Sequence, residues 1–290
     1  MNADKGGLTP GLYLVAVPIG NARDITLRAL DVLRDADILA AEDTRSLRRL
    51  LEIHGVDLRD RQCLPYHDHN GDRMRPKLLG ALAEGRSVAY ASEAGTPMIS
   101  DPGFDLARAA RADGHDVTTA PGVSAVVTAL TLGGLPTDRF FFAGFLPNSR
   151  GPRGRALEDL RDVAATLVFY ESPKRLGAML ADAADKLGPG RPATVCRELT
   201  KRFEEAREGT LAELAAHYEN QPPKGEIVVL VGKGSSEKIN ELDVDNSLTE
   251  ALETMSVRDA ADAVSGLLGV KRRAVYQRAL ALAKGRDQGD

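Results

Sequence analysis

The chain has 290 residues, a formal net charge of −4 and a hydrophobic content of 43%. This apolar content excludes an intrinsically disordered chain, because it is enough to build a folded core. The slightly acidic balance excludes a protein that is basic throughout, so any nucleic acid would have to bind local basic patches.

The first half of the chain alternates short apolar runs, which predict strands, with segments of helical spacing. The strands are expected at 12–17, 36–43, 88–91, 117–120 and 140–145, and the helices at 25–34, 74–84, 104–112 and 124–134. Such alternation favours a mainly parallel sheet with helices on both faces. Sheets of this kind bind ligands at the carboxyl ends of their strands, where the strand order switches.

The second half repeats this alternation after a break rich in Pro, Gly and Arg, which predicts a linker at 146–155. Its strands are expected at 166–170, 193–199 and 226–232, and its helices near 174–187 and 210–219. A polar stretch predicts another linker at 233–250, and helical spacing without a strand signal predicts two helices within 256–286. We therefore expect an N-terminal α/β domain at 1–146, a second α/β domain at 156–233 and a small helical domain at 250–290.

The cysteines and the apolar runs bear on the compartment. Cys63 and Cys196 are far apart and lack metal-ligand spacing, so they predict a reducing compartment rather than a disulfide framework. The N-terminal residues lack the apolar run of a signal peptide, and no stretch approaches the roughly 20 apolar residues of a membrane helix. These features predict a cytoplasmic protein with no membrane association and no bound metal.

The turn after the first strand reads VAVPIGNARDIT. A phosphate-binding loop needs glycines so that backbone N–H groups can approach the anion, whereas Pro18 removes a donor and only Gly20 is free. This pattern argues against a P-loop and against a nucleotide-dependent oxidoreductase. The alternative to a ligand contact here is a simple turn with a helix cap from Asp24 or Thr26.

The loop SEAGTPMISDPG, residues 92–103, is the most informative stretch. It follows a strand, and its prolines stiffen a backbone that its glycines leave permissive. Such a loop can surround a small polar ligand with backbone donors and acceptors, although a plain surface loop is the alternative. The turn PGVSA, residues 121–125, also has two interpretations, because Ser124 can cap the next helix or contact a ligand.

Two charged clusters follow strands of the second domain, YESPKRL at 170–176 and CRELTKRFEE at 196–205. They can face one cleft, or they can be solvated surface. The tail at 270–286 holds six basic residues and no acidic one. It can bind phosphates, or it can be an ordinary amphipathic helix.

Together these motifs resemble the ribosomal RNA small subunit methyltransferase I family of the tetrapyrrole methylase superfamily. The resemblance is carried, in order within residues 12–232, by LYLVAVPIGNARDITLRAL, AEDTRSLRRLL, SEAGTPMISDPG, PGVSA, GLPTDRFFFAGFLP, FYESPKRL, CRELTKRFEE and GEIVVLVG. The segment 256–282 is similar to the small helical domain appended in this family. One position departs from the pattern: the family's loop begins S-D-A-G-T-P, and this chain has Glu93, which keeps the charge on a longer side chain.

The resemblance implies a fold of two α/β domains of tetrapyrrole-methylase type with a small C-terminal helical domain. It implies that S-adenosyl-L-methionine binds in the cleft between the α/β domains. It also implies a homodimer that methylates the 2′-hydroxyl of a cytidine in the decoding region of 16S rRNA, within the small ribosomal subunit. The nearest alternative is a methyltransferase for a tetrapyrrole or another small substrate, and the basic tail favours RNA over it. A further alternative is a non-catalytic RNA-binding ribosome-assembly factor.

The resemblance and the loop chemistry together give the expected site residues. For the methyl donor we expect Pro18, Ser92, Glu93, Ala94, Gly95, Thr96, Pro97, Ile99, Ser100, Ser124, Ala125 and Tyr170. A ribose hydroxyl needs a general base, and the candidates, among which the sequence does not choose, are Asp43, Glu171 and Glu198. Cations that can hold phosphates or a developing alkoxide are Lys174, Arg175, Lys201 and Arg202. RNA contacts are expected from the linker and the tail, at Arg150, Arg153, Lys271, Arg272, Arg273 and Arg278.

Overall fold

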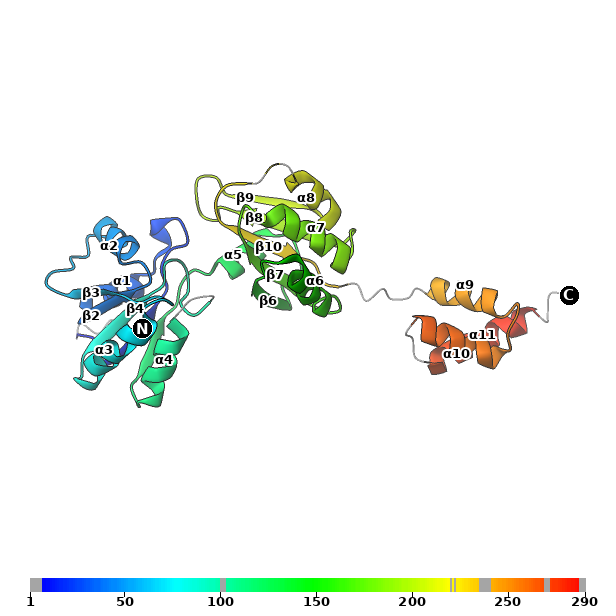
Figure 1. The fold of residues 1–290 in the computed structure, drawn as a ribbon, viewed down its shortest axis with the longest axis horizontal. Helices are drawn as coiled ribbons and strands as arrows, with labels where there is room; N and C mark the ends of the chain where they lie inside the picture. The colour runs from blue at the N-terminus through cyan, green and yellow to red at the C-terminus, as the bar shows by residue number, and fades with distance from the viewer. Residues whose placement is uncertain are drawn as a thin grey trace. The chain divides into compact units, whose positions relative to one another are not determined.

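The computed structural model describes residues 7–99, 103–219, 221, 223–234, 241–268 and 272–286. Two of the expected site residues, Ser100 and Lys271, lie outside the described residues. The chain forms two compact units, Met1–Lys233 and Gly234–Asp290. The first unit holds two five-stranded sheets with their helices, and the second is helical in its described part (Figure 1).

The first sheet is entirely parallel, as the alternation of strands and helices predicts. Its strands are β1 (Gly11–Val15), β2 (Ile38–Ala41), β3 (Gln62–Pro65), β4 (Ser87–Ala91) and β5 (Val117–Ala120), in the order β3-β2-β4-β1-β5. All residues of β2 and β4 are buried, which is why these strands read as continuous apolar runs. The strand β3 was not expected, because its sequence QCLP is short and only half-buried.

Helices cover both faces of the first sheet. One apolar cluster joins α1 (Leu27–Asp35) and α2 (Thr44–Ile53) to one face, through residues such as Leu33 and Leu47. The other cluster joins α3 (Gly71–Ala83) and α4 (Gly103–Ala112) to the opposite face. The N-caps are Thr26 for α1 and Asp43 for α2, and each accepts a hydrogen bond from a backbone N–H of its helix.

The second sheet is mostly antiparallel, which corrects the expectation that it repeats the first. Its strands are β6 (Phe140–Phe145), β7 (Thr166–Glu171), β8 (Pro192–Arg197), β9 (Glu205–Thr210) and β10 (Ile227–Val231), in the order β6-β7-β10-β8-β9. Only β6 and β7 are parallel neighbours, and β10 runs antiparallel to both β7 and β8. The expected boundary at residue 146 assigns β6 to the first domain, whereas β6 pairs with β7 in the second sheet.

Four helices pack on this sheet. The helix α5 (Ala125–Leu132) covers one face through Val126, Ala129 and Leu130, and α6 (Arg150–Asp159), α7 (Leu176–Leu187) and α8 (Leu211–Tyr218) cover the other. The predicted linker at 146–155 is therefore wrong from residue 150 onward. Its composition misleads because Arg153 is only 6% exposed and pairs with Asp182 of α7 inside the domain.

The C-terminal unit holds α9 (Glu241–Ala251), α10 (Val257–Leu268) and α11 (Arg272–Arg286). They share a small apolar core formed by Leu248, Ala260, Ala261, Val264, Val275 and Ala279. The predicted linker at 233–250 is wrong from Glu241, where α9 begins, because Leu248 supplies part of this core. Among the residues that the structure describes, no helix is both long and apolar enough to cross a membrane.

Candidate functional site

The carboxyl ends of the first sheet's strands bring two sequence motifs together. The backbones of Val17 and Gly95 exchange two hydrogen bonds of 3.0 Å each, so the turn after β1 is bound to the loop after β4. Within that loop the Ser92 hydroxyl donates to the Gly95 carbonyl at 3.0 Å, and the Thr96 hydroxyl donates to the Val123 carbonyl at 2.8 Å. The loop is therefore fixed to its neighbours on both sides.

Gly95 has a backbone that other residues rarely adopt, with φ of +74°. A Cβ added there would lie 3.2 Å from Ile19 Cγ2 and 3.5 Å from the Val123 carbonyl oxygen. The loop after β4 thus needs glycine for its conformation, and a larger side chain would press on the turn after β1.

The second sheet contributes three segments to the same region because of the direction of β10. Ile227 at the start of β10 pairs with Glu171 at the end of β7 and with Arg197 at the end of β8. The turn after β8 holds Glu198 and Thr200 at positive φ, +50° and +65°, a strained backbone that is typical of functional sites. This turn also contacts the turn after β1, since the Asn21 N–H donates to the Thr200 hydroxyl at 3.1 Å.

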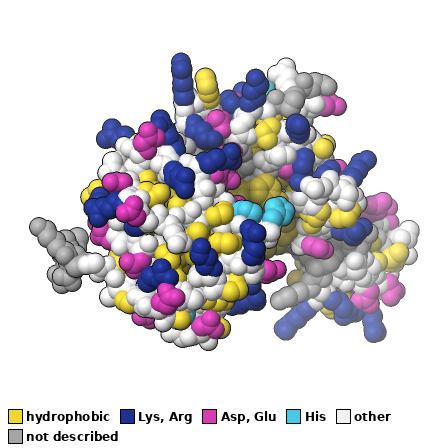
Figure 2. Space-filling model, turned by 60° about the vertical axis from the view of Figure 1, so that its left-hand side comes forward, with side chains coloured by type: hydrophobic (Ala, Val, Ile, Leu, Met, Phe, Trp, Pro, Cys, Tyr) yellow, Lys and Arg dark blue, Asp and Glu magenta, His cyan; other side chains and the backbone are white. Residues whose placement is uncertain are grey.

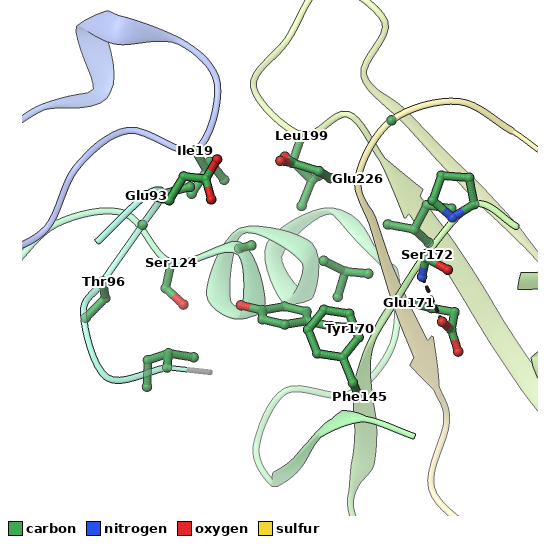
Figure 3. A pocket seen from close by; sticks show the side chains of 18 of the residues that line it. Ile19, Glu93, Thr96, Ser124, Phe145, Tyr170, Glu171, Ser172, Leu199 and Glu226 are labelled. Carbon is green, nitrogen blue, oxygen red and sulfur yellow. Dashed lines mark hydrogen bonds between the residues drawn. The ribbon is translucent and has the colours of Figure 1, made fainter. Parts of the chain in front are cut away.

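A cavity of about 440 Å³ lies where these segments meet, and we call it the donor pocket after the methyl donor that we expect there from the sequence (Figure 3). Its volume falls within the ~300–1,000 Å³ range of small-molecule sites. The segments that follow strands of the first sheet supply Ile19, Glu42, Glu93, Ala94, Gly95, Thr96, Ile99, Ser124 and Ala125. The second sheet and its turns supply Phe145, Tyr170, Glu171, Ser172, Pro173, Leu199, Gly225, Glu226, Ile227 and Val228.

Three polar side chains of the donor pocket are available to a ligand. Ser124 is the N-cap of α5, but its side chain makes no capping hydrogen bond, and Figure 3 shows it beside the Tyr170 ring. The side chains of Tyr170 and Glu93 make no hydrogen bond with any residue that the structure describes. Burial raises the pKa of the Tyr170 hydroxyl, so it stays neutral and can donate a hydrogen bond.

A second hollow, of about 590 Å³, adjoins the donor pocket, and we call it the outer groove. The two share four residues, Ile19, Glu93, Ala94 and Glu226. The rest of its lining comes mainly from the turn after β1, from Ser92 and from α2 with its cap, and includes Pro18, Gly20, Asp43, Arg45 and Arg49. A ligand in the groove would therefore lie directly beside a ligand in the pocket.

Most of the expected donor residues fall in these two hollows. Glu93, Ala94, Gly95, Thr96, Ile99, Ser124, Ala125 and Tyr170 line the donor pocket, whereas Pro18 and Ser92 line the outer groove. Pro97 is buried and lines neither. The loop thus contributes its middle to the pocket, while Ser92 and Pro97 hold its shape.

Glu171 is poorly placed to act as a general base. Its side chain is fully buried, and in Figure 3 the carboxylate turns away from Tyr170 and the pocket, as alternation along a strand requires. It accepts a hydrogen bond of 2.7 Å from the Ser172 N–H, and Arg175 Nε lies 3.1 Å away. Burial raises the pKa of this carboxyl above its ordinary value of 4.5, and the N–H of Ser172 and the charge of Arg175 offset this in part.

Two of the expected catalytic cations, Arg175 and Lys201, are committed to structural contacts. Arg175 donates to the Leu146 carbonyl at 2.6 Å and to the Asn148 side chain, which anchors the chain between β6 and α6. Lys201 Nζ lies between Glu198 at 3.0 Å and Glu226 at 2.9 Å. Lys174 is exposed and lines neither hollow.

Asp43 is the one general-base candidate whose side chain lines the outer groove. Its carboxylate caps α2 and accepts hydrogen bonds from the backbone and side chain of Arg45. These bonds lower the pKa of Asp43, which makes it a weaker base.

The expected RNA contacts have different surroundings. Arg153 is buried and donates to Asp182 at 2.8 Å and to the Asn148 carbonyl at 2.9 Å. It cannot reach a phosphate, so the prediction that Arg153 contacts RNA is wrong. Arg150 is exposed but lies 3.4 Å from Asp182. In the C-terminal unit, Arg272 pairs with Asp262 and Arg278 with Asp245, so these two arginines tie α11 to α10 and α9. Arg273 is exposed.

Several pocket residues were not expected from the sequence. Glu226, Ile227 and Val228 were missed because a parallel arrangement would place the start of β10 at the opposite edge of the sheet. Leu199 lies within a charged motif and Phe145 lies at the end of an apolar strand, and neither pattern indicates a ligand contact at these positions. Among the described residues, no group of three or more His, Cys, Asp or Glu side chains could hold a metal ion.

The raised pKa of Glu171 gives a testable dependence of stability on pH. Above pH 4.5 the unfolded chain releases this proton while the native protein retains it, so the Glu171 contribution to stability falls as pH rises through this window. We expect Glu171→Gln to remove that loss. The free energy of unfolding of the variant should therefore increase relative to that of wild type as pH rises from 4.5. Urea unfolding at a series of pH values measures the difference.

Glu198→Gln is the matched control with the opposite sign. The Lys201 ammonium lowers the pKa of Glu198 below its ordinary value of 4.5. The contribution of Glu198 to stability is therefore present above pH 4.5 and is lost as pH falls through the native pKa. The free energy of unfolding of Glu198→Gln should therefore decrease relative to that of wild type as pH rises. Equal pH profiles for the two variants would contradict this description of the carboxyl groups.

Comparison with known families gives two matches. The family of Tetrapyrrole (Corrin/Porphyrin) Methylases matches residues 11–215, and the RsmI C-terminal HTH domain matches residues 239–283. The first match spans both sheets apart from β10, and the second spans α9 and α10 and most of α11. They confirm the family resemblance that the motifs indicate.

Individual proteins agree with these matches. The chain is 48% identical to a ribosomal RNA small subunit methyltransferase I of Mesorhizobium japonicum, over 98% of this chain and 96% of the relative. It is 41% identical to the protein of that name in Escherichia coli O157:H7, over 93% and 94% of the two chains. The crystal structure of a uroporphyrin-III-C-methyltransferase from Thermus thermophilus superposes with a TM-score of 0.56 at 25% identity, over 77% of this chain and 94% of that one. This likeness confirms the expected fold.

Proposed function

Because the chain belongs to the ribosomal RNA small subunit methyltransferase I family of tetrapyrrole methylases, we propose that it methylates the ribose 2′-hydroxyl of a cytidine in 16S rRNA. The methyl donor is S-adenosyl-L-methionine. The observation that carries the proposal is the donor pocket, built from the loop after β4 and from the strand ends of both sheets, beside a groove open to a second substrate.

The residues of the donor pocket fit this donor. Ile19, Leu199 and Val228 belong to one apolar cluster and form a wall suited to the adenine ring, and the side chains of Ser124 and Tyr170 can donate to its polar groups. Carboxylates at Glu42, Glu93 and Glu226 suit a ligand that carries positive charges. When bound, the donor supplies a methyl group activated by the positive charge of its sulfonium sulfur.

The chain's own task is to orient the acceptor hydroxyl and to receive its proton. Glu93 and Glu226 line both the pocket and the groove, so their carboxylates lie where the two substrates would meet. Glu226 is paired with Lys201, whereas the carboxylate of Glu93 has no hydrogen bond or ion pair with a described residue. We therefore assign the general base to Glu93, in place of Glu171, Glu198 or Asp43.

The finer features of the family complete the proposal. The substrate is 16S rRNA in the small ribosomal subunit, the modified cytidine lies in the decoding region, and the reaction takes place in the cytoplasm. The enzyme acts as a homodimer. The C-terminal unit, with exposed Arg273 on α11, supports binding of the RNA backbone, and the expected contacts at Arg150, Arg272 and Arg278 stay predictions.

Transfer of labelled methyl groups tests this function. Purified small subunits that lack the modification are incubated with the protein and labelled donor, and uroporphyrinogen III is offered in a parallel reaction. We expect label in 16S rRNA and none in the tetrapyrrole. Label in the tetrapyrrole alone would favour the small-substrate alternative, and absence of donor binding in calorimetry would favour a non-catalytic assembly factor.

A test of Glu93 follows from its position on the shared wall. Glu93→Gln keeps the size of the side chain but removes the base, so we expect a large fall in the single-turnover rate at saturating donor. Glu84→Gln is the control, because that carboxylate is exposed and lines neither hollow, so the rate should stay close to wild type. Equal rates for both variants would exclude Glu93 as the base.

A further inference from the structure

The outer groove has chemistry that the donor does not need. Its α2 side carries Arg45 and Arg49, and the turn after β8, residues 198–204, contacts the groove at Gly20 and carries an exposed aromatic ring, Phe203. We propose that this groove binds the single-stranded segment of RNA that carries the acceptor ribose, with Arg45 and Arg49 contacting phosphates and Phe203 stacking on a base. This inference rests on the proposed function, because it places the acceptor of that reaction.

The arginines of α2 are presented together at the groove. Arg45 and Arg49 are four residues apart, so they share one face of the helix. The side chain of Arg45 is 91% exposed and that of Arg49 is 68% exposed. Their partners, Asp43 at 3.2 Å and Glu52 at 2.6 Å, are surface ion pairs, which are weak enough for a phosphate to compete with them.

Phe203 is held out to solvent by a rigid turn. The Thr200 N–H donates to the Glu204 carboxylate at 2.6 Å, and the Glu204 N–H donates to the Lys201 carbonyl at 3.1 Å. The ring of Phe203 is 63% exposed, and the Arg202 guanidinium lies 5.5 Å from its centroid. An exposed aromatic ring beside an arginine is the platform on which proteins stack unpaired bases.

The turn that carries Phe203 touches the groove wall. A Cβ on Gly20, which lines the groove, would lie 2.8 Å from the Thr200 hydroxyl, so the two segments are in close contact. The Asn21 N–H also donates to that hydroxyl at 3.1 Å. Phe203 therefore lies three residues along the chain from a contact with the groove.

The groove carries charges of both signs, so RNA binding there depends on local contacts. Figure 2 shows Lys and Arg side chains interspersed with Asp and Glu over the visible face, which suits a net charge of −4 and calls for local contacts. Within the groove, Asp43 is paired with Arg45, and Glu226 is paired with Lys201 at 2.9 Å. An RNA strand here places its ribose next to the wall that the groove shares with the donor pocket, where Glu93 lies.

Substitution of Phe203 tests the stacking. The full chain is titrated into a fluorescein-labelled single-stranded RNA of decoding-region sequence, and the single-turnover rate on unmodified small subunits is measured in parallel. We expect Phe203→Ala to weaken RNA binding roughly tenfold or more, with donor affinity in calorimetry unchanged. Phe203→Trp should restore binding, and Phe203→Leu should not, because leucine keeps apolar area without a ring face.

The chain offers a matched control for this substitution. Phe104 on α4 is 54% exposed, has the Arg108 guanidinium 5.5 Å from its centroid, and lines neither hollow. Phe104→Ala should therefore leave RNA affinity unchanged. Equal losses for the two variants, or full binding by Phe203→Leu, would overturn the stacking role.

The arginines are tested through the dependence of RNA affinity on salt. Losing one phosphate contact with a single strand lowers the slope of log affinity against log salt by about 0.7. We expect Arg45→Ala and Arg49→Ala to lower it by about that amount each, whereas Arg34→Ala, which breaks a similar exposed pair with Asp31 on α1, should not. An unchanged slope in both groove variants would contradict phosphate contacts by Arg45 and Arg49.

Failure of this inference is distinguishable from failure of the proposed function. If the wild-type protein methylates small subunits while the groove variants bind and react normally, the proposed RNA binding in the outer groove is wrong and the proposed function stands. If the wild-type protein binds the RNA through Phe203 but transfers no methyl group to it, the proposed function fails and the groove remains an RNA site.

Discussion

Replacing Gly95 with valine should raise the dissociation constant for S-adenosyl-L-methionine by at least about tenfold and abolish methyl transfer. The first reason is backbone conformation, because φ at Gly95 is +74° and a β-branched residue is strongly disfavoured there. The second is space, because the added Cβ would press on Ile19, which lines both hollows. Isothermal titration calorimetry with the full chain measures the affinity.

Gly85→Val is the matched control for that substitution. Gly85 follows α3 with a similar φ of +76°, and a Cβ added there meets no atom within 4 Å. The control should therefore lose a comparable amount of stability through backbone strain while its donor affinity stays unchanged. If Gly95→Val retained tight donor binding, the loop after β4 would not form the donor pocket.

Removing Gly234–Asp290 should weaken association with the small subunit by at least about tenfold and leave donor affinity unchanged. The described residues that line the donor pocket all fall between Ile19 and Val228, and none of them belongs to the C-terminal unit. The removed unit matches the RsmI C-terminal HTH domain and carries the basic helix α11. Sedimentation with small subunits and calorimetry with the donor measure the two effects.

A point variant separates the charge of this unit from its fold. Arg273 is exposed, whereas Arg272 and Arg278 also hold the helices together through Asp262 and Asp245. Arg273→Ala should therefore lower small-subunit affinity without loss of helical structure. Unchanged affinity after deletion of the whole unit would contradict its role in RNA binding.

The central strands of the first sheet could be predicted from the sequence because they are buried on both faces. The residues of β2 and β4 form apolar runs that few other structures allow. The helix α2 was missed because TRSLRRLLEI buries only Leu47 and Leu51 and exposes its arginines. The edge strand β9, EAREGT, has no buried residue and therefore no apolar signal.

The site was predictable where it depends on local chain chemistry and not where it depends on strand direction. The loop after β4 could be recognised from its glycines and prolines, and its middle lines the donor pocket. Local sequence gives no indication that β10 runs antiparallel, so the contribution of Glu226, Ile227 and Val228 appears only in the fold. The burial of Arg153 likewise depends on Asp182, which lies on another helix.

The position of the transferred methyl group tests the central claim most directly. Small subunits that lack the modification are methylated by the wild-type protein with labelled donor, the 16S rRNA is digested to nucleosides, and mass spectrometry locates the label. We predict 2′-O-methylcytidine from a single nucleotide of the decoding region, and no labelled product with the Gly95→Val variant. Label on a base, or label in protein with none in RNA, would contradict ribose methylation by this enzyme.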